Sequence, residues 1–163
     1  MVIAAMKESE MPNRDSHDKS SRSFEPHGHA SMYIVEKNIV VYKSTGPFNE
    51  EFLKSVEALE TKALRALTES GKYRGEIIIF EKSCMATNGM FEYFPKYLQN
   101  MKQEGLGNVI SSFVFPEDVE GSSMMAPHYE KCYASAGIKF GAFKQYDAAL
   151  SWVKAELESI DAR

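Results

Sequence analysis

Residues 75–105, GEIIIFEKSCMATNGMFEYFPKYLQNMKQEG, decide the fold, because their pattern is typical of one buried strand, one loop and one helix. The run Ile77, Ile78, Ile79 and Phe80 is continuously apolar and rich in β-branched residues. Such a run is typical of a strand covered on both faces, as the central strands of α/β sheets are. We therefore predict a central strand in which Ile78 is fully buried.

The loop after this strand should lie at its carboxyl end, where open α/β sheets usually bind ligands. Four polar residues stand there: Lys82, Ser83, Thr87 and Asn88. With the unpaired amides of the following helix, they could bind a phosphate, a carboxylate or a lipid headgroup. We take these four residues as a candidate regulatory or anion-binding site. The alternative is that Thr87 or Asn88 only caps the helix.

Pro95 limits where that helix begins, because proline is harmless only in the first helical turn. We therefore predict regular helix from Phe91 or Glu92 onward, with residues 83–90 as loop. Gly105 is a suitable residue for the end of the helix.

The rest of the chain alternates strands and helices. Hydrophobic periodicity and turn residues predict a hairpin over 32–37 and 39–44, a helix capped by Asn49 and ending near 70–71, strands over 108–115 and 138–143, and helices over 124–136 and 146–159. The expected fold class is therefore α/β, with a mixed sheet of about five strands, an antiparallel first strand and about four helices.

Two regions differ in composition. Residues 1–30 are polar, with mixed charges, and predict a disordered tail, whereas residues 31–163 predict one folded domain. The tail holds His17, His27 and His29, but a closed metal site needs more ligands, so we expect no metal.

Composition narrows the function classes. The chain has 163 residues and a net charge of -4, with 19 basic and 23 acidic residues and no basic stripe, which argues against nucleic acid as a partner. No window predicts a membrane span or signal peptide, so we expect a cytoplasmic location. Cys84 and Cys132 fit no metal or disulfide pattern and are expected to be free thiols.

Catalytic patterns are weak. No GxGxxG, P-loop, HExxH or GxSxG motif occurs, so neither an enzyme nor a cofactor is expected. Cys84 beside Lys82 could be an activated thiolate, but a spectator thiol is the preferred interpretation. The acids Glu117, Asp118 and Glu120 could bind a cation, although a solvated loop explains them.

Four segments carry a resemblance to a known family: TGPFNEE (45–51), GEIIIFEK (75–82), NVISSFVFPEDVEG (108–121) and FGAFKQYDAALSWV (140–153). With the order of predicted elements, they resemble the STAS and SpoIIAA-like domain family, above all its small stand-alone bacterial members, from Tyr33 to Leu157. The resemblance implies a compact regulatory or protein-interaction domain without catalytic activity.

In signalling members of that family, a partner kinase phosphorylates a serine or threonine at the start of the helix after the central strand, within an Asp-Ser-Ser-Gly-like segment. The matching segment here, EKSCMATNGM (81–90), lacks that pattern, and Ser83 or Thr87 would hold the role.

Lipid-binding relatives with a similar sheet imply the alternative, a carrier or sensor of a small apolar ligand. The candidate apolar pocket at the carboxyl end of the sheet consists of Met90, Phe91, Phe94, Met124 and Met125. The expected partners are thus a protein or a small apolar or anionic ligand, and a homodimer is left open.

Overall fold

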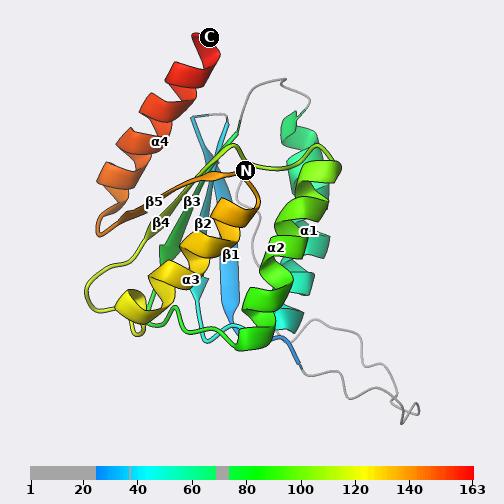
Figure 1. Cartoon of the computed structure of the whole chain (residues 1–163), viewed down its shortest axis with the longest axis vertical. Coiled ribbons are helices and arrows are strands. Elements are labelled where there is room, and N and C mark those ends of the chain that lie inside the picture. The colour runs from blue at the N-terminus through cyan, green and yellow to red at the C-terminus, as the bar shows by residue number, and fades with distance from the viewer. Residues whose placement is uncertain (1–24, 37, 69–73) are drawn as a thin grey trace.

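The computed structural model describes residues 25–36, 38–68 and 74–163. Its elements follow one another in the predicted alternation (Figure 1). They are β1 (His29–Val35), β2 (Ile39–Thr45), α1 (Glu50–Thr68), β3 (Gly75–Phe80), α2 (Asn88–Gln103), β4 (Ile110–Val114), α3 (Ser122–Ser135), β5 (Lys139–Phe143) and α4 (Tyr146–Asp161). Within the described ranges, no helix is both long and apolar enough to cross a membrane.

The strands form one sheet in the order β1-β2-β3-β4-β5, in which β1 is antiparallel to β2 and the others are parallel. This confirms the predicted α/β fold with a mixed sheet, and β3 is its central strand. Each parallel connection steps to the next strand in the same direction. Because such crossovers share one hand, α1, α2 and α3 lie on the same face of the sheet, and α4 covers the other (Figure 1).

The central strand alternates between these two faces. Ile77 and Ile79 point toward α4, and Ile77 is completely buried. Glu76, Ile78 and Phe80 point toward the face covered by α1, α2 and α3. The prediction that Ile78 is fully buried is wrong: the side chain is partly buried because it lines a cavity that is partly open to solvent.

The start of α1 is anchored by Asn49. Its side-chain oxygen accepts the backbone N–H of Phe52 at 3.0 Å, which confirms the predicted cap. The same oxygen accepts the N–H of His27 at 2.8 Å, and the Asn49 amide donates to the carbonyl of Glu25. These bonds tie the segment before β1 to the domain. β1 itself begins at His29, so His29 and Ala30 belong to the sheet rather than to the predicted tail.

Two of the predicted features lie in parts of the chain that the structure does not describe. Residues 70–71, the predicted stop of α1, and residues 1–24, which include His17, lie outside the described residues. Among the described residues, no group of three or more histidines, cysteines or acids is placed to hold a metal ion.

Helix α2 corrects the predicted boundary. It begins at Asn88 rather than near Phe91, so Pro95 lies in its interior instead of its first turn. Proline has no N–H for the carbonyl four residues earlier, which is that of Phe91. That carbonyl instead accepts the thiol of Cys132 on α3, with Sγ and oxygen 3.9 Å apart. Similarly, α3 begins at Ser122, two residues before the prediction, and includes Pro127.

Truncating Ile77 and Ile78 of β3 should show that one face of the strand is tightly packed and that the other borders a cavity. Ile77→Ala should lower the free energy of unfolding by about 2–5 kcal/mol, because it removes buried methyl groups and leaves a new void. Ile78→Ala should cost less, because this side chain already borders open space. Urea melts of the two variants provide the measurement. Equal losses, or a larger loss for Ile78→Ala, would contradict this assignment of the two faces.

Candidate functional site

The loop after β3 is held between two other loops. On one side, an isolated parallel bridge pairs Ala86 with Phe48, in the segment after β2. On the other side, a second bridge pairs Ser83 with Glu120, in the acidic segment after β4. The Cys84 N–H donates to the Glu120 carbonyl at 3.0 Å. The loops at the carboxyl ends of β2, β3 and β4 therefore form one connected edge.

The four candidate polar residues of this loop are in different environments. Lys82 is exposed and has a positive φ of 62°. Ser83 is buried, and its hydroxyl accepts the Met85 N–H at 3.2 Å. Thr87 and Asn88 are exposed at the start of α2, where the Thr87 hydroxyl accepts the N–H of Met90 at 3.3 Å. The structure thus separates Ser83 from the exposed pair.

Protein acceptors take up much of this loop's hydrogen-bonding capacity. The N–H of Ser83 donates to the Glu81 carbonyl, and the N–H of Thr87 donates to the Phe48 carbonyl. The N–H groups of Cys84 and Met85 also donate to protein acceptors, so four amides of this loop have partners within the protein. The exposed side chains of Lys82, Thr87 and Asn88 are among the polar groups that stay accessible at this edge.

The five residues of the candidate apolar pocket are not brought together as one wall. Met90 and Phe94 line the cavity beside Ile78. Phe91 instead lines a groove between α2 and α3. Met125 is buried in the core, whereas Met124 is 61% exposed on α3.

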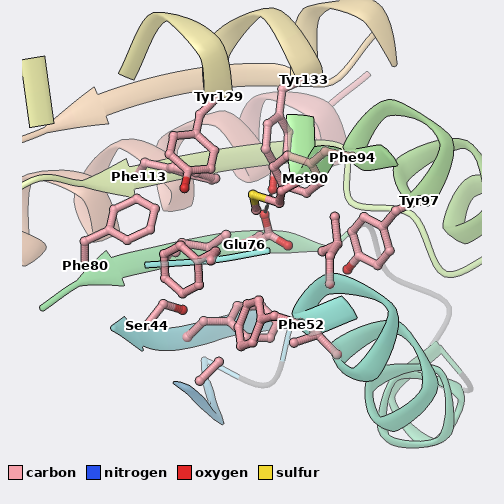
Figure 2. Close-up of a pocket in the computed structure, with 16 residues that line it drawn as sticks. Ser44, Phe52, Glu76, Phe80, Met90, Phe94, Tyr97, Phe113, Tyr129 and Tyr133 are labelled. Carbon is pink, nitrogen blue, oxygen red and sulfur yellow. Dashed lines mark hydrogen bonds between the residues drawn. The ribbon is translucent and has the colours of Figure 1, made fainter. Parts of the chain in front are cut away.

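The cavity lined by Met90 and Phe94 lies between the sheet and its three covering helices, and it is partly open to solvent (Figure 2). Its walls are mainly aromatic, and several rings contact one another: the ring centroids of Phe113 and Tyr129 are 5.1 Å apart, and those of Phe80 and Phe113 are 5.5 Å apart. The cavity volume is about 50 Å³. This space is large enough to hold water.

A buried carboxylate lies at the cavity. Glu76, on β3, is only 3% exposed and accepts hydrogen bonds from Tyr133 at 2.5 Å, from Ser111 at 2.7 Å and from Asn108. The Asn108 side chain in turn accepts the Nε–H of Arg74 at 2.8 Å. Three donors from β4, its preceding loop and α3 therefore compensate the loss of water around this carboxylate.

A second buried carboxylate, Glu60, comes from α1. One of its oxygens accepts the Tyr42 hydroxyl and the other accepts the Tyr97 hydroxyl, so it links α1 to β2 and to α2. Burial, and then the nearby charge of Glu76, raise the pKa of Glu60 to about 7, while the two tyrosine hydrogen bonds and Arg74 act in the opposite direction. The buried Glu60 side chain therefore titrates near neutral pH.

The two buried acids were missed by sequence reasoning, although both leave a signal. Glu60 continues the apolar helical series of Leu53, Val56 and Leu64, so it occupies a core position of α1. Glu76 follows Gly75 directly in the central strand. An acid at a position where the pattern requires an apolar residue indicates a buried polar partner.

Both cysteines are in surroundings that favour the neutral thiol. Both are buried, and neither forms a disulfide, which confirms the prediction of free thiols. Burial is the main cause that raises the pKa of each thiol to about 11. The Cys84 thiol donates to the Glu120 carbonyl at 3.2 Å, so it helps to hold the loop after β3.

The groove between α2 and α3 is the larger hollow, with a volume of about 300 Å³. Within it, the His128 ring lies 5.1 Å from the ring of Phe91. Pro95 and Cys132 also line the groove. So does Asn88, the first residue of α2, so the groove extends to the start of that helix. The groove is thus a mixed surface: Phe91, Pro95 and Cys132 supply apolar groups, and Asn88, Glu92, His128, Lys131 and Ser135 supply polar or charged ones.

No protein-family model, curated protein or solved structure shows a significant match to this chain.

Replacing Glu60 with glutamine should remove a pH dependence of stability. Because the pKa of Glu60 rises from 4.5 to about 7 on folding, the folded chain between these values keeps a proton that the unfolded chain has released. The free energy of unfolding should therefore fall as pH rises through that window, by at most about 1.4 kcal/mol per pH unit, and level off above it. Glu60→Gln stays neutral and should abolish this fall.

Denaturant melts at several pH values measure this effect as a difference between the wild type and the variant. Glu57→Gln is a matched control on the same helix, since Glu57 also accepts a tyrosine hydroxyl, that of Tyr93 at 2.5 Å. This control should keep the wild-type slope. If the wild type and Glu60→Gln have parallel profiles between pH 4.5 and 7, the assignment of the proton to Glu60 is wrong.

Proposed function

We propose that this chain is a non-catalytic regulatory, protein-interaction domain of the STAS and SpoIIAA-like type, with Thr87 as its regulatory hydroxyl. The sequence resemblance supports the family, and the five-stranded mixed sheet with four helices is compatible with it. The observation that carries the proposal is the position of Thr87: its side chain is exposed at the start of the helix after the central strand.

Thr87 suits this role better than Ser83. A kinase must reach the hydroxyl, and Ser83 is only 6% exposed, lying in a segment bridged to Glu120. Thr87 is exposed, and its hydroxyl makes one capping bond, which a phosphate oxygen can replace. A phosphate would also gain from the positive end of the α2 dipole.

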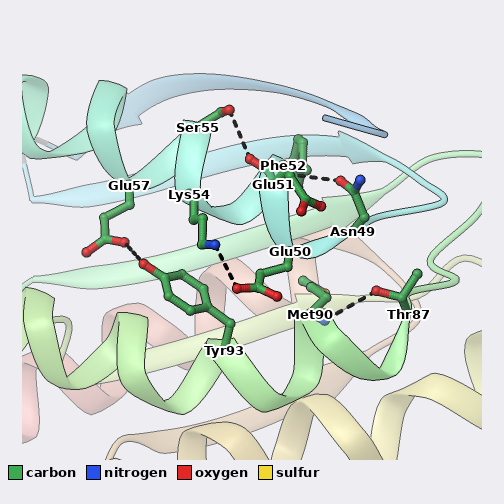
Figure 3. A network of polar contacts seen from close by, with 10 residues as sticks. All are labelled: Asn49, Glu50, Glu51, Phe52, Lys54, Ser55, Glu57, Thr87, Met90 and Tyr93. Atoms are coloured by element: carbon green, nitrogen blue, oxygen red, sulfur yellow. Dashed lines mark hydrogen bonds and ion pairs between the residues drawn. The ribbon is translucent and has the colours of Figure 1, made fainter. Parts of the chain in front are cut away.

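A phosphate on Thr87 would affect the contact between α1 and α2. Glu50 lies at the start of α1, where one of its oxygens is near Gly89 of α2, and it forms an ion pair with Lys54 at 2.8 Å (Figure 3). The Lys54 ammonium also lies 5.4 Å from the centre of the Tyr93 ring on α2. New negative charge nearby would repel Glu50 and attract Lys54. The modification would therefore change the surface formed by both helices.

The alternative function is a carrier or sensor of a small apolar ligand. The cavity between the sheet and its three covering helices, at about 50 Å³, is far below the roughly 300–1,000 Å³ typical of ligand pockets. The groove between α2 and α3, at about 300 Å³, reaches the lower end of that range and includes Phe91 from the predicted pocket. A carrier would therefore use this groove, and its ligand would be small.

Intact mass spectrometry of the protein purified from its own cells tests the two functions. We expect a population carrying one phosphate, located on Thr87 by fragmentation. Thr87→Ala should lose this population, and Ser83→Ala should retain it. A bound small molecule seen under native conditions, without phosphate, would favour the carrier. Protein that carries neither modification nor ligand, or phosphate at other sites only, would contradict the proposal.

Stability measurements separate this role from simple capping. Thr87→Ala should lower the free energy of unfolding by about 1 kcal/mol, because the cap of α2 is lost. Thr87→Ser keeps both the cap and a phosphorylatable hydroxyl, so it should keep wild-type stability and the phosphate. A Thr87→Ser variant that is as stable as the wild type but is never phosphorylated would leave Thr87 as a cap alone.

A further inference from the structure

The outer edge of β1 is an unusual surface of this sheet. β1 is the first strand in the sheet order, and among the described residues no strand pairs with its outer side. Of the described elements, only β2 makes extensive contact with it. None of its seven residues is fully buried, and Ile34 is 39% exposed. The strand therefore presents an open row of backbone donors and acceptors beside apolar side chains.

The opposite edge of the sheet is protected in ways that β1 is not. β5 is a shorter strand that contains Lys139 and Gly141, and it contacts both α3 and α4. The Lys139 ammonium forms an ion pair with Glu156 at 2.6 Å, so a charge stands on this edge. Lysine and short strands are features by which proteins prevent sheets from joining. β1, HASMYIV, contains no lysine, arginine, acid or proline.

The sequence of β1 is also complementary to itself. If two copies pair antiparallel about Met32, each Ala30 lies opposite Ile34 of the second copy, and each Ser31 lies opposite Tyr33 of the second copy. Small residues thus face large ones on both faces of the joined sheet, and no like charges are opposed. A two-fold axis makes such a contact closed, so it stops at two copies.

We propose that the protein forms a homodimer through antiparallel pairing of β1 with β1 of a second copy, which joins the two sheets. A second copy is preferred over an unrelated peptide because this strand supplies the matching side chains itself. Thr87 and the groove between α2 and α3 are not part of β1, so this interface does not depend on the proposed regulatory role.

Sedimentation velocity of the full chain over a range of concentrations tests the proposal. The wild type should sediment as a dimer. Ile34→Lys should weaken dimerisation by roughly tenfold or more, because it places a lysine on each strand of the shared edge. Met124→Lys is the matched control, since Met124 is an exposed apolar residue on α3 and should leave the dimer unchanged. A monomeric wild type would overturn the proposal.

Hydrogen exchange identifies the surface that is used. In the β1–β2 hairpin alone, only alternate β1 amides have a partner, whereas edge pairing protects the intervening amides as well. The wild type should therefore show continuous protection of β1, and Ile34→Lys should show alternating protection. Ser31→Lys, on the other face of the strand, should also disrupt the dimer. It replaces Ile34→Lys as the test if that variant does not fold. A dimer that keeps alternating protection, or that persists in both lysine variants, would overturn this interface.

Discussion

The fold depends on the burial of two carboxylates in an aromatic core. An uncompensated charge in such a place would be strongly destabilising, so Glu60 and Glu76 require donors in fixed positions. Those donors come from β2, α2, α3, β4 and the loop before β4. Apolar packing alone allows helices to shift on a sheet, but these hydrogen bonds require a particular register. The two acids therefore specify how α1, α2 and α3 sit on one face.

The aromatic core also contacts the loop after β3. Phe80, Phe113 and Tyr129 surround the cavity, and the Tyr129 hydroxyl reaches beyond it to the carbonyl of Cys84 at 3.0 Å. The loop after β3 is thereby connected to the core as well as to its two neighbouring loops. The polar residues exposed at the start of α2 therefore follow a loop that is held in place by these contacts. Recognition by a partner benefits from such preorganisation, because less conformational freedom is lost on binding.

The sequence predicted the order of strands and helices because runs and repeats of apolar residues mark the elements that pack together, although they did not predict the partial burial of Ile78. The run from Ile77 to Phe80 identified the central strand, and Asn49 identified the start of α1. Helix boundaries near Pro95 and Pro127 were less predictable, because tertiary contacts can satisfy a carbonyl that proline leaves open, as Cys132 does for Phe91. The sequence also did not show that the residues of the predicted apolar pocket lie in different places. Residues at helical spacing can face either the sheet or a neighbouring helix, and only the packing of α3 decides which.

The arrangement of three helices on one face and one on the other affects how the chain folds during synthesis. Ala149, Val153 and Leu157 of α4 cover Ile77 and its apolar neighbours on that face. The ribosome makes α4 after all five strands, so the other described elements leave this face of the nascent sheet uncovered until α4 has been made. An uncovered apolar sheet is prone to aggregation and is a target for chaperones. The last helix thus determines how long the growing chain needs protection.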